Sequence, residues 1–244
     1  MNFYPIFWKD LLLIRKKPWK FAAASMVMPL LYLVTFGWGL GRGMQMAGGG
    51  TYLDFVLPGL LVMSAMNNSF GPVSTSVNVS KLYTKTIEEV LVSPVSPWDV
   101  ALGRSLTGLV RGLFSACLLL LIGMLSGVRL SLTPLFFVVL ALTAFCFAAA
   151  GVAAAMVARS HEDMSNFNSF VIIPMSFLAG TFFTPDKLPE PFHSAILIYP
   201  LTHASLALRE LAAGREPGLA SVLVLAAYAG LFYYLAGRMM KRAL

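Results

Sequence analysis

The feature that most constrains this chain is a series of long stretches without a single charged residue. In a bilayer every backbone polar group must be bonded within the protein, and about 20 consecutive apolar residues cross the hydrocarbon core as an α-helix. The sequence therefore predicts an all-α integral membrane protein with six transmembrane helices. The uncharged stretches cover residues 21–41, 55–80, 112–128, 130–158, 164–185 and 217–237.

The predicted spans follow these stretches with small adjustments at their ends. The third helix is expected to start near Ser105, because the Arg111 side chain can reach the interface from within it. Residues 193–208 are broken by Pro200 and His203, so a re-entrant or interfacial helical segment is predicted there in place of a seventh span. The spans are then residues 21–41, 55–80, 105–128, 132–158, 165–185 and 217–237, with an outer re-entrant region at 186–216.

The composition excludes several other classes of protein. Of 244 residues, 58% are hydrophobic and 12% are charged, whereas soluble domains carry about 25% charged residues. No polar stretch of domain size is left over, so residues 1–244 are expected to form a single membrane domain. The formal net charge of +7 gathers at span ends without an aromatic-interleaved patch, so membrane lipid and not nucleic acid is the expected partner.

The basic residues also predict the orientation. With six spans both termini lie on one side of the membrane, and 13 of the 18 Lys and Arg residues fall on that side. The positive-inside rule therefore places both termini in the cytoplasm.

Residues 1–20 predict an amphipathic helix on the cytoplasmic membrane surface. Phe3, Phe7, Leu11 and Ile14 fall along one face of such a helix. Lys9 and Lys16 fall on the opposite face. A plain basic flank to the first span is the alternative, but it needs no aromatic periodicity, and the surface helix is favoured.

The longest cytoplasmic loop, residues 81–104, contains a compact amphipathic pattern. Thr84 or Thr86 can cap a short helix whose first turns carry an acidic pair, and Pro94 and Pro97 stop it. Such an exposed helix would suit docking of a cytoplasmic partner, and a solvated turn is the alternative. The residues of this predicted helix are Thr86, Ile87, Glu88, Glu89, Val90 and Leu91.

The second and fifth predicted spans carry amides that lipid disfavours. Asn67 and Asn68 lie near the middle of the second span, and Asn166 and Asn168 open the fifth. Such side chains face either another helix, which is the commoner case, or a water-accessible route. These two spans are therefore the candidates for lining a pathway.

The chain lacks the motifs of independent chemistry. It has no GxxxxGK[ST] phosphate-binding loop, so ATP, Mg²⁺ and ATP hydrolysis are expected on a separate subunit. His161, Glu162 and Asp163 lack HExxH spacing, and Ser115 has no histidine or carboxylate at its depth. No catalytic, cofactor or metal site is expected, and an intramembrane enzyme and a membrane anchor or assembly factor stay as alternatives.

The sequence resembles the permease subunits of type-2 ATP-binding-cassette exporters, the branch that exports drugs, polysaccharides and lipo-oligosaccharides. The resemblance covers nearly the whole chain. Besides the basic surface helix, it rests on YLDFVLPGLLVMS at the start of the second span, TIEEVLVSPVSPWDVALGRSL in the loop, and the proline-rich TPDKLPEPFHSAILIYPLTH. The loop is the most specific segment, because the family typically has an acidic pair, a leucine or valine, a Ser/Thr-Pro element and a hydrophobic return with a glycine.

This resemblance implies a bacterial inner-membrane transport permease, not an enzyme, that moves a hydrophobic or amphipathic compound, a drug or a (lipo)polysaccharide outward. It implies a dimer, with a second copy or a paralogous permease, bound to two ATPase subunits through a coupling helix over residues 86–91. The implied pathway at the dimer interface has lining candidates Asn67, Asn68, Phe70, Phe170 and Phe177, with an outer gate at Phe182 and Phe183.

Overall fold

The computed structural model describes residues 3–16, 18–40, 52–85, 95–183, 189–190 and 192–242. Every regular element in these ranges is a helix, which confirms the predicted all-helical class. The elements are α1 (Tyr4–Lys16), α2 (Pro18–Tyr32), the π-helix η1 (Leu33–Leu40), α3 (Tyr52–Leu82), α5 (Pro97–Leu125), α6 (Pro134–Val157), α7 (His161–Phe167), the π-helix η3 (Asn168–Ile172), α8 (Ile173–Leu178), α9 (Phe192–Ile196), α10 (Pro200–Ala212) and α11 (Leu219–Arg242).

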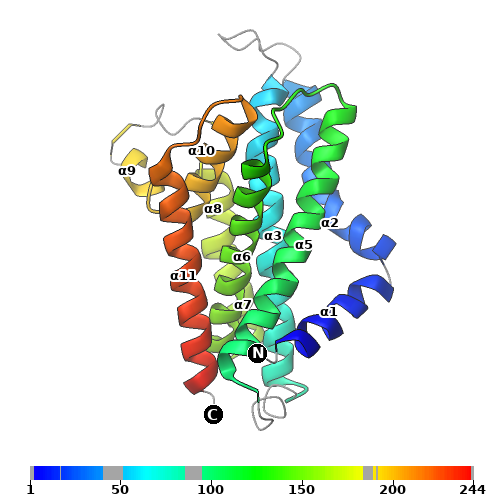
Figure 1. Ribbon diagram of the computed structural model, residues 1–244, viewed down its shortest axis with the longest axis vertical. Coiled ribbons are helices and arrows are strands. Elements are labelled where there is room, and N and C mark those ends of the chain that lie inside the picture. The colour runs from blue at the N-terminus through cyan, green and yellow to red at the C-terminus, as the bar shows by residue number, and fades with distance from the viewer. Residues whose placement is uncertain are drawn as a thin grey trace.

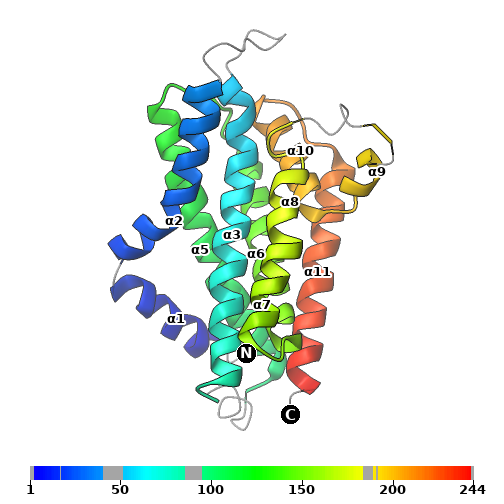
Figure 2. The same ribbon diagram turned by 180° about the vertical axis from the view of Figure 1, so that it is seen from behind.

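The long helices form an upright bundle in which successive segments alternate in direction (Figures 1 and 2). α3, α5 and α6 pack against one another, and α11 packs against α5 and α6. Figure 1 places the N- and C-terminal ends of the chain at the same end of this bundle. We call this end the terminal end, and the opposite one the outer end.

Three of the described helices are long and apolar enough to cross a membrane, judged by length and composition: α5, α6 and α11. The other predicted spans coincide with α3, with α2 plus η1, and with the run from α7 to α8. α3 is long enough, with 31 residues, but its asparagines and serines lower its mean hydropathy, so it is not among these three. The count of six crossings stays a prediction.

Local sequence explains where the apolar helices begin. The Ser96 hydroxyl accepts a hydrogen bond from the Trp98 backbone N–H, and Pro97 occupies the first turn of α5. Thr133 caps α6 in the same way, with Pro134 in its first turn. A polar cap followed by proline starts a helix, because proline lacks only an N–H that the helix leaves unpaired at that position.

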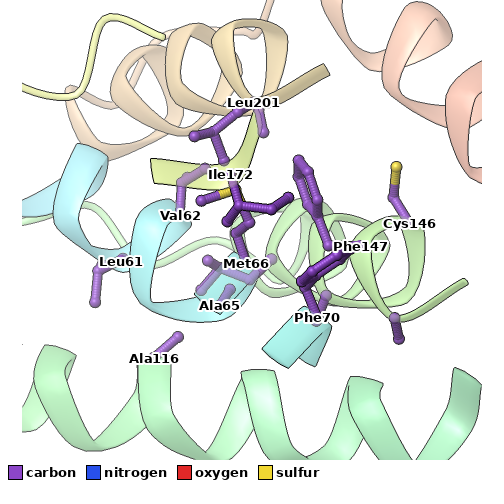
Figure 3. Packing of buried hydrophobic residues seen from close by; sticks show 14 of the residues in the cluster. Leu61, Val62, Ala65, Met66, Phe70, Ala116, Cys146, Phe147, Ile172 and Leu201 are labelled. Carbon is purple, nitrogen blue, oxygen red and sulfur yellow. The ribbon is translucent and has the colours of Figure 1, made fainter. Parts of the chain in front are cut away.

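Small residues let the three central helices approach closely. A methyl group on Gly112 of α5 would lie 2.7 Å from the Ala65 carbonyl oxygen of α3 and 2.8 Å from the Ala144 Cβ of α6. Helices in a membrane associate largely through such packing, since lipid is as apolar as the side chains. Figure 3 shows the neighbouring buried cluster, in which Phe70 of α3 lies among Phe147 and Ile172.

The two peripheral regions form helices where the sequence predicts them. α1 leans out from the terminal end of the bundle (Figure 1), with Lys9 and Lys16 exposed and Phe3, Phe7 and Leu11 half-buried. The predicted outer region, residues 186–216, contains α9 and α10 at the outer end, and α10 packs against α3, α6 and α11. α10 therefore closes that end of the bundle.

Candidate functional site

A cavity of about 340 Å³ lies between α2, α3 and α8. We call it the α2–α3–α8 cavity. It brings together three of the predicted pathway residues, Asn67, Asn68 and Phe177. Its other lining residues are Ser25, Pro29, Tyr32, Leu60, Met63, Ser64, Ile173 and Ser176.

Ser64 and Ser176 at this cavity have hydrogen-bond partners within the protein, while the two asparagines differ from each other. The Ser64 and Ser115 hydroxyls lie 2.8 Å apart, and Ser176 donates to the Ile172 carbonyl. Asn68 donates to the Ser64 carbonyl at 3.0 Å, whereas Asn67 is exposed. The cavity therefore presents an amide on an otherwise mainly apolar wall, an arrangement that holds an amphipathic molecule and fixes its polar end.

An aromatic cluster borders the cavity. The Phe182 ring stacks on Phe177 with centroids 5.7 Å apart and lies 5.8 Å from the Tyr32 ring. Tyr32 meets Phe177 edge to face, and the Tyr52 hydroxyl donates to the Phe182 carbonyl at 3.3 Å. The predicted gate residue Phe182 thus joins helices α2, α3 and α8 next to the cavity.

Arg209 of α10 fastens the segment that carries both predicted gate residues. Its guanidinium donates to the carbonyls of Thr181 at 2.7 Å, Phe183 at 3.3 Å and Phe55 at 3.3 Å. It also lies 4.0 Å from the centre of the Phe55 ring, close enough for a cation–π contact. Burial lowers the Arg209 pKa to about 10, so the side chain remains charged at neutral pH.

Sequence reasoning missed Arg209, although a signal was present. It is a cation in an otherwise largely apolar helix, on a segment too short to cross a membrane. Such a charge needs partners when it is buried. The partners are backbone carbonyls far away in sequence, which no spacing pattern reveals.

The remaining predicted pathway residues lie elsewhere. Phe70 is only 1% exposed and stacks on Phe167 with ring centroids 5.7 Å apart, outside the α2–α3–α8 cavity. Phe170 is 78% exposed and lines no described cavity. The proposed roles of Phe70 and Phe170 in a pathway stay predictions.

The predicted coupling residues 86–91 lie outside the described residues, but both flanks of their loop are described. On the α3 side, the Lys81 ammonium donates to the carbonyls of Met156 at 2.6 Å and Ala158 at 2.8 Å. These carbonyls end α6, where a cation is favoured by the helix dipole. Burial lowers the Lys81 pKa, and the contact ties the end of α3 to the end of α6.

On the α5 side, a buried ion pair ties α5 to α1. Arg104 contacts the Asp10 carboxylate at 2.9 Å and also donates to the Ser76 hydroxyl of α3 at 3.2 Å. Asp10 is 7% exposed. It is the acid in a basic segment, and it falls three residues after Phe7 on the inward face of α1, a signal that could have identified it.

The described residues offer little for hydrolysis or metal binding. Ser115, the nucleophile weighed above, pairs with Ser64. In the outer region, Ser194 and His193 both contact the Glu190 carboxylate, at 2.9 and 3.2 Å. The histidine is therefore not on the serine hydroxyl, and the hydrogen bond from Ser194 lowers the pKa of Glu190, which makes this carboxylate a weaker base. Within the ranges described above, no group of three or more His, Cys, Asp or Glu side chains could hold a metal ion.

Comparison with known proteins agrees with a transport role. The YadH inner membrane transport permease of Escherichia coli K12 is 33% identical over 169 residues, which cover 66% of this chain and 63% of YadH. This chain therefore aligns with less than two thirds of that relative's length. Nodulation protein J of Rhizobium meliloti strain 1021 is 28% identical over 242 residues, covering 93% of this chain and 89% of that protein.

The family model named ABC-2 type transporter matches residues 1–212, which contain the α2–α3–α8 cavity, the aromatic cluster and both flanks of the predicted coupling loop. This match confirms the resemblance to type-2 permeases, and the chain belongs to the ABC-2 type transporter family.

Proposed function

We propose that this chain is the permease subunit of an ATP-driven exporter that moves a hydrophobic or amphipathic compound, a drug or a (lipo)polysaccharide out of the cytoplasm or the inner leaflet. Six helices cross the membrane, and both termini lie in the cytoplasm. Family membership supports the transport role. The excess of basic residues on the side of the termini supports the orientation.

The observation that carries the proposal is the α2–α3–α8 cavity. It combines apolar walls with the amides of Asn67 and Asn68, and polar groups at this depth are costly unless they serve packing or a pathway. The stacked Phe177 and Phe182 rings border it on the side where the proposed outer gate lies. A small displacement of α8 would change the access to this space.

A second permease completes the pathway. The run from α7 to α8 exposes the large apolar side chains of Phe167, Phe170, Ile173 and Phe177. A contiguous apolar face of this kind is typical of a contact surface. We propose that this face meets a second copy of the chain, or a paralogous permease, and that Phe170 acts there.

The energy comes from a partner ATPase that holds ATP and Mg²⁺. The helix predicted over residues 86–91 is the docking element, and Glu88 and Glu89 present its charge. ATP binding draws two ATPase subunits together, their movement reaches the permeases through this element, and the dimer opens outward.

The first experiment is purification of the tagged chain in mild detergent, with identification of co-purifying proteins and an ATPase assay. Recovery of a nucleotide-binding subunit in equal amount, with vanadate-sensitive hydrolysis, is expected. Recovery of the chain alone, without ATPase activity in any detergent, would contradict the proposal.

The docking role is tested by charge reversal. The double variant Glu88→Lys/Glu89→Lys should lose the ATPase subunit or its stimulation. Glu162→Lys is the matched control, because Glu162 is an exposed acid at the start of α7, in the other predicted cytoplasmic loop. Unchanged ATPase stimulation in the double variant would rule out the proposed docking element.

The pathway is tested by chemical access. In a chain carrying Cys117→Ser and Cys146→Ser, the Asn67→Cys variant should react with a water-soluble maleimide, at a rate that changes when the partner ATPase binds nucleotide. Leu223→Cys, exposed on α11, should face lipid and react slowly. Equal slow labelling at both positions would exclude Asn67 from an aqueous pathway.

A further inference from the structure

A second, larger hollow of about 650 Å³ lies along α6 on the side away from the cavity. We call it the α6–α11 groove. Its volume lies within the roughly 300–1,000 Å³ that sites for small ligands occupy. Alanines of α6 form its floor, and side chains from the run α7 to α8 and from α11 form its two walls.

The groove and the α2–α3–α8 cavity share α8 as a common wall. Ile173, Ser176 and Phe177 line the cavity, whereas Ile172 and Met175 line the groove. Ile172 ends η3 and Met175 lies in α8, so the two sets lie on different, adjoining faces of this stretch of helix. The groove is therefore distinct from the cavity of the proposed pathway, and the segment around α8 borders both.

The lining of the groove is apolar except at one end. The floor includes Ala150, Ala153 and Ala154, and α11 contributes Phe232 and Leu235. The charged lining residues are Arg159 and Asp163, and both follow the terminal end of α6.

The length of the groove corresponds to one leaflet. Its lining on α11 runs from Tyr228 to Met239, a rise of about 17 Å at 1.5 Å per residue. The hydrocarbon core of a bilayer is about 30 Å thick, so this is close to half. At the end of the groove nearer the outer end of the bundle, the Tyr228 hydroxyl donates to the Ile198 carbonyl at 2.7 Å. With the orientation proposed above, the groove lies in the cytoplasmic leaflet.

Arg159 lines the terminal end of the groove, and Arg242 follows one helical turn after Met239, the last α11 residue in the lining. Arg159 is exposed at the end of α6. Arg242 is exposed too, and it falls on the same face of α11 as Leu235 and Met239, because residues three and four apart are neighbours on a helix. The nearby Asp163 carboxylate already accepts the backbone N–H groups of Arg159 at 2.8 Å and Ser160 at 3.2 Å.

We infer that the α6–α11 groove binds an anionic phospholipid of the cytoplasmic leaflet, with an acyl chain along the alanine floor and the headgroup between Arg159 and Arg242. An apolar groove open to hydrocarbon is filled by a lipid chain, and the paired arginines select a headgroup with negative charge. The bound chain packs against Ile172 and Met175, next to the face that lines the cavity.

The test is native mass spectrometry of the full chain, with any bound subunit, in detergent containing equal amounts of phosphatidylglycerol and phosphatidylethanolamine. The chain should retain phosphatidylglycerol in preference to phosphatidylethanolamine. Arg159→Gln/Arg242→Gln should lower this preference about five-fold for each arginine removed. Arg215→Gln, a change at an exposed arginine before α11, is the matched control and should leave the preference unchanged.

Filling the groove tests the acyl chain. Ala154→Phe should lower retention of both lipids, and Ala227→Phe, at an exposed position of α11 outside the lining, should not. Equal retention of the two lipids by the unmodified chain, or an unchanged preference in the double arginine variant, would overturn the inference. A dimer that carries no lipid and that dissociates in the Ala154→Phe variant would also overturn the inference, because a second copy of the chain would then occupy the groove.

Two features keep these outcomes interpretable. Arg159 and Arg242 are exposed, so their variant reports on the headgroup even where Ala154→Phe fails to fold. Lipid retention is read without ATPase activity, so loss of transport and loss of this site are distinguishable.

Discussion

α6 and the run from α7 to α8 follow one another in the chain and both contribute to predicted membrane spans, yet they have different surroundings. α6 is a regular helix with most of its side chains buried between α3, α5 and α11. The following run is interrupted by the π-helix η3 and by Pro174, and nearly all of its side chains from Ser165 to Val171 are exposed. Assignment to a predicted span therefore does not show whether a helix is packed in the core or exposed on a face of the bundle.

The difference arises from side-chain size and from helix regularity. α6 is rich in alanine and glycine, including Ala144 and Ala148 against α5, and small residues allow backbones to approach. The run from α7 to α8 carries large side chains such as Phe167 and Phe170 outward. A π-turn also shifts which residues share a face, and such turns occur often at functional sites.

The largest expected effect comes from truncating a buried aromatic of α6. Phe136 is fully buried, so Phe136→Ala should lower the free energy of unfolding by about 3–5 kcal/mol through lost packing. Unfolding of the purified chain in mixed SDS micelles measures this. A loss below about 1 kcal/mol would mean that lipid or neighbouring side chains fill the space and that α6 is less tightly packed than its burial indicates.

Adding one methyl group compares the packed interior of the bundle with its outer surface, and effects of opposite sign are expected. Gly112→Ala should lower the free energy of unfolding by about 2 kcal/mol, because the new Cβ meets α3 and α6. Gly230→Ala on α11 has open space around it and should raise stability by up to about 1 kcal/mol, since glycine is entropically costly in helices. Equal effects at the two sites would contradict the close packing of the bundle.

Removing the Arg209 contacts should affect the outer segment more than the bundle. Arg209→Gln leaves the Thr181, Phe183 and Phe55 carbonyls without their charged donor, and a loss of about 2 kcal/mol is expected. Hydrogen exchange should rise in residues 181–183 more than in α6. Arg215→Gln is the control, and equal effects of both variants would argue against the contacts.

The smallest effect on stability is expected in the exposed run. Phe170→Ala should change the free energy of unfolding of the single chain by no more than about 0.5 kcal/mol, since Phe170 is 78% exposed. If the proposed dimer is correct, the same variant lowers the dimer fraction in cross-linking experiments. A stability loss as large as that of Phe136→Ala would remove the distinction between the two regions.

The sequence predicted the helices better than the faces they present. The second predicted span, residues 55–80, lies within α3, because a long uncharged stretch can satisfy its backbone in few other ways. The fifth was predicted to reach residue 185, but α8 ends at Leu178. Gly180 follows with φ of 74°, a left-handed conformation that ends the helix.

The candidate site was also predictable only in part, because the sequence identifies the polar residues of a span but not the direction of each side chain. Asn67 and Asn68 were identified by their cost in lipid, and they line a cavity. Phe70 was grouped with them, but it lies about 200° around the helix from Asn68 and faces the opposite side. Rotation of a helix about its axis depends on packing against distant residues, which one sequence does not specify.

The contacts of Lys81 and Arg104 have a mechanical consequence. Residue 85 and residue 95 bound the loop that carries the predicted coupling helix, and each side of it enters a helix fixed to a neighbour, α3 to α6 and α5 to α1. A displacement applied to the loop would therefore act on α6 and α1 as well as on the two helices that the loop joins.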